Sequence, residues 1–166
     1  MSSRVWVRPT ARVVVLDPAG RVLLLGARLT DPAVPPGDVL FWYTPGGGVE
    51  PGEGVRDAAA RELAEEIGLV VDPRELEGPV WLRRHVGPFA GVDIDSRETF
   101  FVLRDVVHEV APRGLTELEL LGAEPHRWWS AEEVAASAET FAPRDLADLL
   151  PELSAGPWTG PPRFVG

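Results

Sequence analysis

Three glutamates, Glu62, Glu65 and Glu66, lie close together in a segment rich in strong helix formers, Val55 to Ile67. At about 100° per residue they fall within one arc roughly 100° wide, so their carboxylates crowd one face of the predicted helix. Like charges at this spacing cost about 0.2 to 0.5 kcal/mol per pair, and we expect something to compensate. A divalent cation can do so, because Mg²⁺ prefers carboxylate oxygens and keeps several waters, some of which a phosphate can replace.

A second interpretation of the same helix face needs no metal. Arg61 lies four residues from both Asp57 and Glu65 and can pair with either. Charge runs of this kind are usually solvated surface. The pattern within the helix therefore leaves two alternatives open, a cation site and a salt-bridged surface.

Glycines gather immediately before this helix, in the stretch TPGGGVEPGE from Thr44 to Glu53. Glycine tolerates positive φ and has no side chain, so the backbone can turn sharply and approach a ligand closely. The chain then enters the N-terminus of a helix, where free N–H groups favour anions. Two other phosphate-binding patterns are excluded, because Glu53 stands where a P-loop needs lysine and Pro51 stands where a dinucleotide fingerprint needs its third glycine.

The spacing of residues from Gly47 to Leu69 resembles the Nudix box, the signature of the Nudix hydrolase family. It reads Gly47, five residues, Glu53, seven residues, then Arg61, Glu62, Leu63, one residue, Glu65, Glu66, one residue, Gly68 and Leu69. Every fixed position of the box is present. The resemblance implies that Glu62, Glu65 and Glu66 bind catalytic Mg²⁺ or Mn²⁺. It also implies that Glu53 supports the metal site from the loop and that Arg61 braces the site by a salt bridge.

The resemblance implies an enzyme that hydrolyses a pyrophosphate bond in a nucleoside diphosphate linked to another group, such as a nucleoside triphosphate or a nucleotide sugar. Metal ions would offset charge at phosphorus and activate the attacking water, so no covalent intermediate is needed. No secondary signature selects the substrate, since Pro88 stands too late for the proline of ADP-ribose hydrolases. The alternative is a nucleotide-binding regulatory module without turnover, in which we would expect an eroded box.

Further substrate contacts are expected beside the box. Gly46, Gly47 and Gly48 would approach the substrate with their backbone, and Trp42 and Tyr43 can stack on a base. These aromatic residues also belong to a short predicted strand. At least one of them is therefore expected in the core instead.

One more acidic residue is implied by the family, in which a carboxylate from the loop before the final strand often adds a metal ligand or acts as general base. The segment LTELELLGAE, residues 115–124, offers Glu117, Glu119 and Glu124. We favour Glu117, because it lies far enough from the strand to move when substrate closes the loop. The alternative is that all three are solvated charges.

The order of the elements fits the family's α/β fold, an α/β/α sandwich with a mixed central β-sheet. One Nudix domain is expected over residues 1–154. Its strands are expected at Ala11–Asp17 and Arg21–Ala27, paired as a hairpin, and at Leu40–Thr44, Val80–Val86, Thr99–Val107 and His126–Ser130, with loops at 28–39 and 87–98. Helices are expected at Val55–Ile67, Ala131–Glu139 and Pro143–Leu153, with Gly68 ending the first. The Pro/Gly-rich tail, residues 155–166, is expected to lack regular structure, although Trp158 and Phe164 can anchor it.

Composition narrows the setting of this chemistry. The chain of 166 residues carries a net charge of −10 and has neither cysteine nor lysine, so any metal must bind oxygen or one of the 3 histidines. General nucleic-acid binding is not expected, because it would need a basic face. No apolar stretch approaches the roughly 18 residues of a membrane span. We expect a soluble, cytoplasmic protein that acts on a small nucleotide-type molecule, and the sequence leaves open whether it is a monomer or a homodimer.

Overall fold

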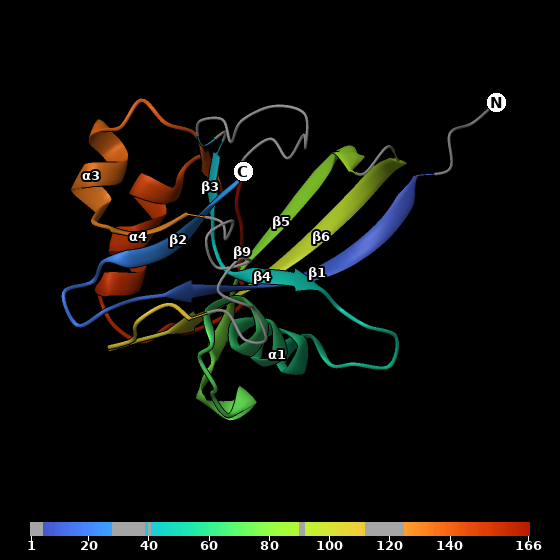
Figure 1. Cartoon of the computed structure of the whole chain (residues 1–166), viewed down its shortest axis with the longest axis horizontal. Coiled ribbons are helices and arrows are strands. Elements are labelled where there is room, and N and C mark those ends of the chain that lie inside the picture. Colours follow the sequence, from blue (N-terminus) through green and yellow to red (C-terminus); the bar gives the residue numbers. More distant parts are fainter. Residues whose placement is uncertain (1–4, 28–38, 40, 90–91, 112–124) are drawn as a thin grey trace.

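The computed structural model of the protein describes residues 5–27, 39, 41–89, 92–111 and 125–166, which form two mixed β-sheets flanked by helices (Figure 1). The five-stranded sheet has the order β4-β1-β6-β5-β9, and the four-stranded sheet has the order β7-β2-β3-β8. The strands are β1 (Trp6–Val15), β2 (Val22–Ala27), β3 (Phe41–Tyr43), β4 (Gly46–Gly48), β5 (Glu77–Phe89), β6 (Val92–Leu103), β7 (His126–Trp129), β8 (Phe141–Ala142) and β9 (Arg163–Phe164). The helices are α1 (Val55–Ile67), α3 (Ala131–Ala136) and α4 (Leu146–Ser154), with a 3₁₀ turn, η1 (Pro73–Glu75).

Two hydrophobic cores lie on opposite faces of the sheets, and alternate residues of the same strands reach each core. Val13 and Val15 of β1 belong to one core with Leu63 of α1. Val14, between them, belongs to the other core with Leu149 of α4. Helix α1 therefore covers one side of the sheets and α4 the other, which confirms the predicted α/β/α sandwich (Figure 1).

The predicted hairpin is correct only at its turn. An isolated antiparallel bridge joins Leu16 to Val22 where β1 and β2 follow one another. Beyond this bridge the strands separate, because β1 pairs with β4 and β6 whereas β2 pairs with β3 and β7. Both strands carry apolar residues on both faces, so each can lie centrally in its own sheet. The predicted central sheet is accordingly divided into two mixed sheets.

The segment predicted as a loop, residues 87–98, is mostly strand, since β5 and β6 extend into it from both sides. Two of its acidic residues pair with arginines of β5 across the strands. Arg83 bonds Glu98 at 2.8 Å, and Arg84 bonds Asp95 at 2.8 Å. Such opposite-charge pairs stabilise neighbouring strands.

The C-terminal segment adds a strand to the larger sheet. Strand β9 pairs in parallel with Trp81 and Leu82 of β5. The prediction of a tail without regular structure is therefore wrong at Arg163 and Phe164. Trp158 packs against the core as an anchor, whereas Phe164 is 81% exposed. None of the helices in the described ranges combines the length and the apolar character that a membrane crossing requires. The predicted loop at 28–39 lies, apart from Val39, outside the described residues.

Candidate active site

The glycine segment brings the backbone close to helix α1. Strand β4 lies antiparallel to β1, with Gly46 opposite Arg12 and Gly47 opposite Ala11. Gly46 has a φ of 151°, and a Cβ there would stand 2.1 Å from the carbonyl oxygen of Ala11. A Cβ on Gly47 would stand 2.5 Å from a carboxylate oxygen of Glu62. A side chain at position 46 would clash with the backbone of β1, and one at position 47 would displace the carboxylate of Glu62, so the glycines allow the close approach that the sequence predicted.

Helix α1 has its predicted bounds and its predicted polarity. Its buried residues are Ala58, Ala59, Ala60, Leu63 and Ile67. Gly68 ends the helix with a φ of 71°, and its N–H donates to the carbonyl oxygen of Leu63. On the remaining surface of the helix, Glu65 is exposed and Glu62 and Glu66 are half-buried. The expected carboxylate face is therefore present.

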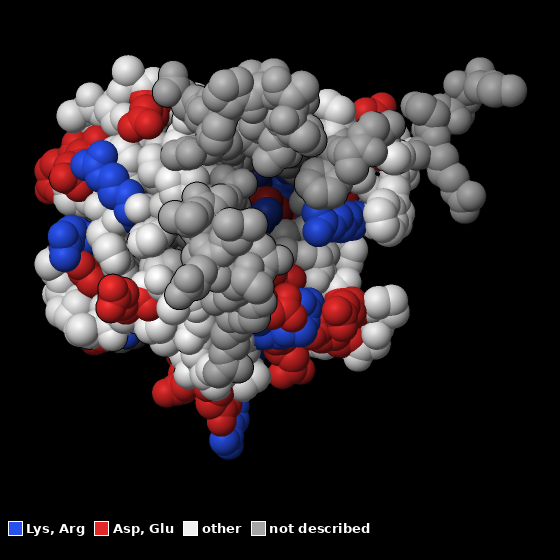
Figure 2. Space-filling view, viewed as in Figure 1, with Lys and Arg blue, Asp and Glu red and all other residues white. Residues whose placement is uncertain are grey.

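Arg61 stands at the centre of the acidic residues. Its Nε and Nη2 atoms donate to both carboxylate oxygens of Glu53, at 2.9 and 3.0 Å. Nη2 also donates to the carbonyl oxygen of Gly48 at 3.0 Å, and Nη1 donates to Glu62 at 3.0 Å and Glu65 at 3.4 Å. The guanidinium of Arg61 lowers the pKa of Glu53, and Glu53 in turn raises the pKa of Arg61. The salt bridge expected of Arg61 is present, with Glu53 as its partner, and acidic and basic side chains lie side by side over this region (Figure 2).

Glu66 is hydrogen-bonded directly to the glycine turn, residues 44–48. The N–H of Gly46 donates to its Oε2 atom at 2.8 Å. Burial raises the pKa of Glu66 to about 7, despite the opposing effect of that hydrogen bond, and the charge of Glu62 adds to the rise. Near neutral pH the carboxyl group of Glu66 is therefore partly protonated as long as no metal ion is bound to it.

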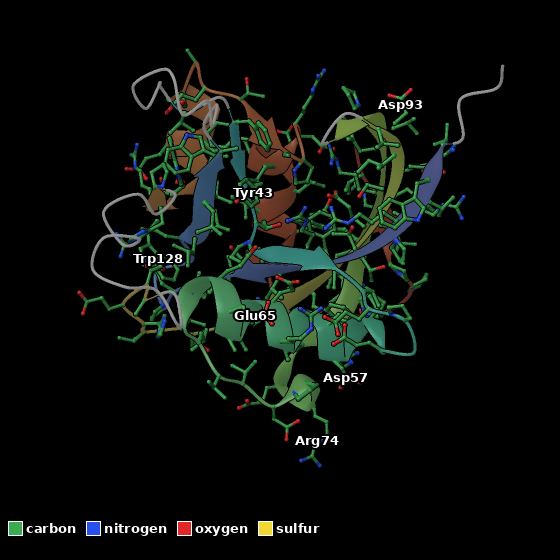
Figure 3. All side chains as sticks on the ribbon, turned by 45° about the vertical axis from the view of Figure 1, so that its right-hand side comes forward. Tyr43, Asp57, Glu65, Arg74, Asp93 and Trp128 are labelled. Carbon is green, nitrogen blue, oxygen red and sulfur yellow. The ribbon has the colours of Figure 1, made fainter. Side chains whose placement is uncertain are left out.

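The three carboxylates offer the hard oxygen donors that Mg²⁺ and Mn²⁺ prefer. In the part of the chain that the structure describes, however, no group of three acidic or histidine side chains converges closely enough to hold an ion. Arg61 occupies one oxygen each of Glu62 and Glu65, while Glu66 is turned to the glycine turn. Glu65 is 59% exposed on α1, near β4 (Figure 3), and has room to rotate. The donors fit a divalent ion in kind, and binding would require Arg61 to release Glu62 and Glu65 while it keeps Glu53.

The aromatic residues before the box divide between the core and the surface. Trp42 is only 7% exposed, packs edge-on against Trp129 and donates its indole N–H to Glu139, so its prediction as a substrate contact is corrected to a core role. Tyr43 is half-buried and lies beneath the guanidinium of Arg12, 5.6 Å from ring centroid to Cζ. Of the two predicted aromatic contacts, Tyr43 remains the candidate.

Sequence reasoning missed Arg12. Its Nη1 atom donates to the carbonyl oxygens of Thr44 and Gly46 at 3.3 and 3.2 Å, and its Nε atom donates to Glu98 at 3.3 Å. The available signal was a charged residue directly before the apolar run Val13 to Val15, because such a residue needs a partner when the strand is buried. The partners are Thr44, which follows β3, Gly46 of β4 and Glu98 of β6, and no local pattern links these residues to β1.

The remaining predicted candidate, Glu117, and its alternatives Glu119 and Glu124 are outside the described residues. Of the histidines, His108 places its Nε2 atom 2.7 Å from the carbonyl oxygen of Ile67.

The model of the NUDIX domain family matches residues 6–153. An RNA pyrophosphohydrolase of Dinoroseobacter shibae is 41% identical over 83 residues, which cover 49% of this chain and 48% of that protein. An RNA pyrophosphohydrolase of Cereibacter sphaeroides is 29% identical over 143 residues, which cover 81% of this chain and 82% of that protein.

The fold also has a close counterpart among solved structures. The MutT protein of Methanosarcina mazei superposes with a TM-score of 0.60 at 20% identity, over 93% of this chain and all of that one (100%). At 20% identity this structural likeness shows the fold alone. The sequence match to the Dinoroseobacter protein spans only about half of that relative's length (48%). The family model, by contrast, covers the larger part of the chain and every residue of the box, so the chain belongs to the Nudix hydrolase family.

Proposed function

We propose that the chain is a metal-dependent hydrolase that cleaves the pyrophosphate bond of a nucleoside diphosphate linked to another group. The observation that carries this proposal is the direct link between the glycine turn and the acidic helix face, the hydrogen bond from Gly46 to Glu66. Arg61 adds a second link between loop and helix through Glu53. A phosphate chain bound at the turn would lie beside the carboxylates.

The residues of the box have separate tasks in this proposal. Glu62, Glu65 and Glu66 would hold Mg²⁺ or Mn²⁺, which when bound would mask phosphate charge and lower the pKa of the attacking water. Arg61 and Glu53 would keep the loop against α1. The glycines would let the phosphates approach the backbone N–H groups without hindrance. Water would form the new bond to phosphorus as the bond to the leaving phosphate oxygen breaks.

The substrate class is wider than the sequence suggested. The relatives named as RNA pyrophosphohydrolases add RNA to the nucleoside triphosphates and nucleotide sugars as a candidate substrate. Because internal RNA linkages are phosphodiesters, a pyrophosphate bond would be found at a phosphorylated end of the strand. Recognition of an end needs a site for the phosphates and the first nucleotide rather than a basic surface along the strand. A net charge of −10 is therefore compatible with such a substrate. Tyr43 and the glycine turn would contact the terminal nucleotide.

A panel of substrates tests the proposal. Nucleoside triphosphates, nucleotide sugars, dinucleoside polyphosphates and a short 5′-triphosphorylated RNA would each be incubated with the protein and Mg²⁺ or Mn²⁺. Release of pyrophosphate, orthophosphate and nucleoside monophosphate would be measured. We expect turnover of at least one member. Nucleotide binding by the folded protein without turnover of any member would instead support the regulatory-module alternative.

Mg²⁺ should raise the melting temperature more at about pH 8 than at about pH 6. Glu66 has a folded-state pKa of about 7, above its ordinary value of 4.5, so the stability it contributes is present at acidic pH and lost as the pH rises through its folded-state pKa. A cation must displace the proton at the lower pH but not at the higher one. Thermal melts with and without millimolar Mg²⁺ at both pH values measure the difference. An equal or larger shift at the lower pH would contradict metal binding at Glu66.

We also propose that Glu117 is the general base. Glu117→Gln should lower kcat by about 10²-fold or more with little change in melting temperature, as expected for loss of a group that accepts a proton from water. Glu119→Gln and Glu124→Gln are the matched controls, because they remove the same charge from the same segment. Steady-state rates and melting curves of the three variants decide. Near-normal rates in all three would place the base within the box, with Glu65 the first candidate.

A further inference from the structure

A buried glutamate outside the Nudix box connects two arginines across three strands. Glu98 of β6 has an exposed fraction of only 8%. Its Oε1 atom accepts from Nε of Arg12 on β1 at 3.3 Å, and its Oε2 atom accepts from Nη1 of Arg83 on β5 at 2.8 Å. Both oxygens of the carboxylate are thus bonded to a cation, one on each neighbouring strand.

Arg12 continues this connection to the box. Its Nη1 atom donates to the carbonyl oxygens of Thr44 and Gly46, the residues on either side of the bend from β3 into β4. The N–H of Gly46 in turn donates to Glu66 at 2.8 Å. The path from Glu98 to the carboxylate face therefore has three steps, which are Glu98 to Arg12, Arg12 to the glycine turn, and the glycine turn to Glu66.

The geometry of Arg12 explains why the glutamate matters. A guanidinium has several N–H groups in a rigid plane, so bonds on two of its sides fix its orientation. Glu98 holds the Nε side, and the two carbonyl oxygens take hydrogen bonds from Nη1. Without the carboxylate, one side would lose its charged acceptor, and Arg12 could turn away from the carbonyl oxygens.

We propose that Glu98 is a positioning residue of the active site: through Arg12 it fixes the glycine turn, and so the hydrogen bond from Gly46 that holds Glu66. The structural part of this inference concerns the turn alone. Its effect on turnover rests on the proposed function.

The structure supplies a matched control on the same strand. Asp95 of β6 is also buried, with 3% exposed, and is also bonded to two arginines, Arg84 and Arg97. The side chains of Asp95 and Glu98 lie on opposite faces of the sheet, because the two positions on β6 are an odd number of residues apart. The two ion pairs of Asp95 join it to Arg84 of β5 and to Arg97 of its own strand, away from the glycine turn. Asp95→Asn therefore removes a buried charge from β6 without breaking the proposed path.

Amide hydrogen exchange at Gly46, followed by NMR far below the melting temperature, tests the inference without substrate or metal. Glu98→Gln should speed exchange of this N–H about tenfold or more relative to the wild type, whereas Asp95→Asn should leave it within about twofold. Arg12→Lys provides a second variant, because lysine keeps the charge but cannot bond Glu98 and both carbonyl oxygens together. It should also speed the exchange. Unchanged Gly46 exchange in folded Glu98→Gln and Arg12→Lys would overturn the proposal.

Kinetics give the second arm once the substrate panel has identified a substrate. Glu98→Gln should lower kcat about tenfold with KM nearly unchanged, and the double variant Glu98→Gln/Arg12→Lys should be no slower than Arg12→Lys alone, because both act through one path. Asp95→Asn is expected to lower the melting temperature and to keep the kcat of the wild type. The same result for Glu98→Gln would mean that Glu98 has only a structural role and would overturn the proposal. If no substrate is found, the proposed function fails while the exchange experiment still decides the role of Glu98.

Discussion

Glu66→Gln should reduce turnover by about 10³-fold, since loss of a residue that merely orients a metal ligand already costs about 10- to 100-fold. The substitution removes the negative charge from the carboxylate that lies nearest the glycine turn. It keeps the shape of the side chain, and the amide oxygen can still accept from the N–H of Gly46, which is 2.8 Å away in the wild type. The fold and the turn should therefore survive while the metal site does not.

The measurement for this prediction is kcat on the best substrate of the panel, together with a melting curve. Glu132→Gln is the matched control, because it makes the same chemical change at an exposed glutamate on helix α3. It should retain the wild-type rate. A Glu66→Gln variant with wild-type turnover under Mg²⁺ would rule out the assignment of Glu66 as a metal ligand.

Gly47→Ala should lower kcat/KM by about 10²-fold, the scale expected when a catalytic group is displaced by about 1 Å. The new Cβ would stand 2.5 Å from Oε1 of Glu62, so the carboxylate would have to move away from the turn. Gly47 does not have the positive φ of Gly46, so the alanine backbone itself should be tolerated. The loss should therefore appear in the rate more than in the melting temperature.

Gly87→Ala is a suitable control for this prediction. A Cβ there would stand 3.1 Å from the side chain of His85. That side chain is exposed and can shift. Gly47→Ala should lose activity whereas Gly87→Ala should keep it, and the melting temperatures of the two variants should differ much less than their rates. Normal activity of Gly47→Ala would mean that the contact between the turn and Glu62 is irrelevant to the reaction.

The parts of the site that the sequence predicted are those encoded within a short stretch of chain. Helix α1 follows from the propensities of its own residues, and Gly68 ends it in the left-handed conformation that glycine tolerates best. The pair of Glu53 with Arg61 joins two residues of the same box. In each of these cases both partners belong to one local pattern.

The parts that the sequence did not predict depend on partners far along the chain. Nothing near Arg12 indicates that Glu98 of another strand will be its neighbour. The alternation in FWY could not decide which aromatic ring enters the core, because that depends on Trp129 of the four-stranded sheet, against which Trp42 packs. Strand β9 was missed because a two-residue pairing leaves no trace in a Pro/Gly-rich segment.

In the proposed reaction, this chain uses water to break a phosphorus–oxygen bond between two phosphates. The most direct test is to run the reaction on the best substrate of the panel in ¹⁸O-labelled water with Mg²⁺ and to analyse the phosphate-containing products by mass spectrometry. We predict that one ¹⁸O atom per turnover appears on a phosphorus of one product, and that its position identifies the phosphorus attacked. Turnover that leaves every phosphate-containing product unlabelled would contradict attack of water at phosphorus.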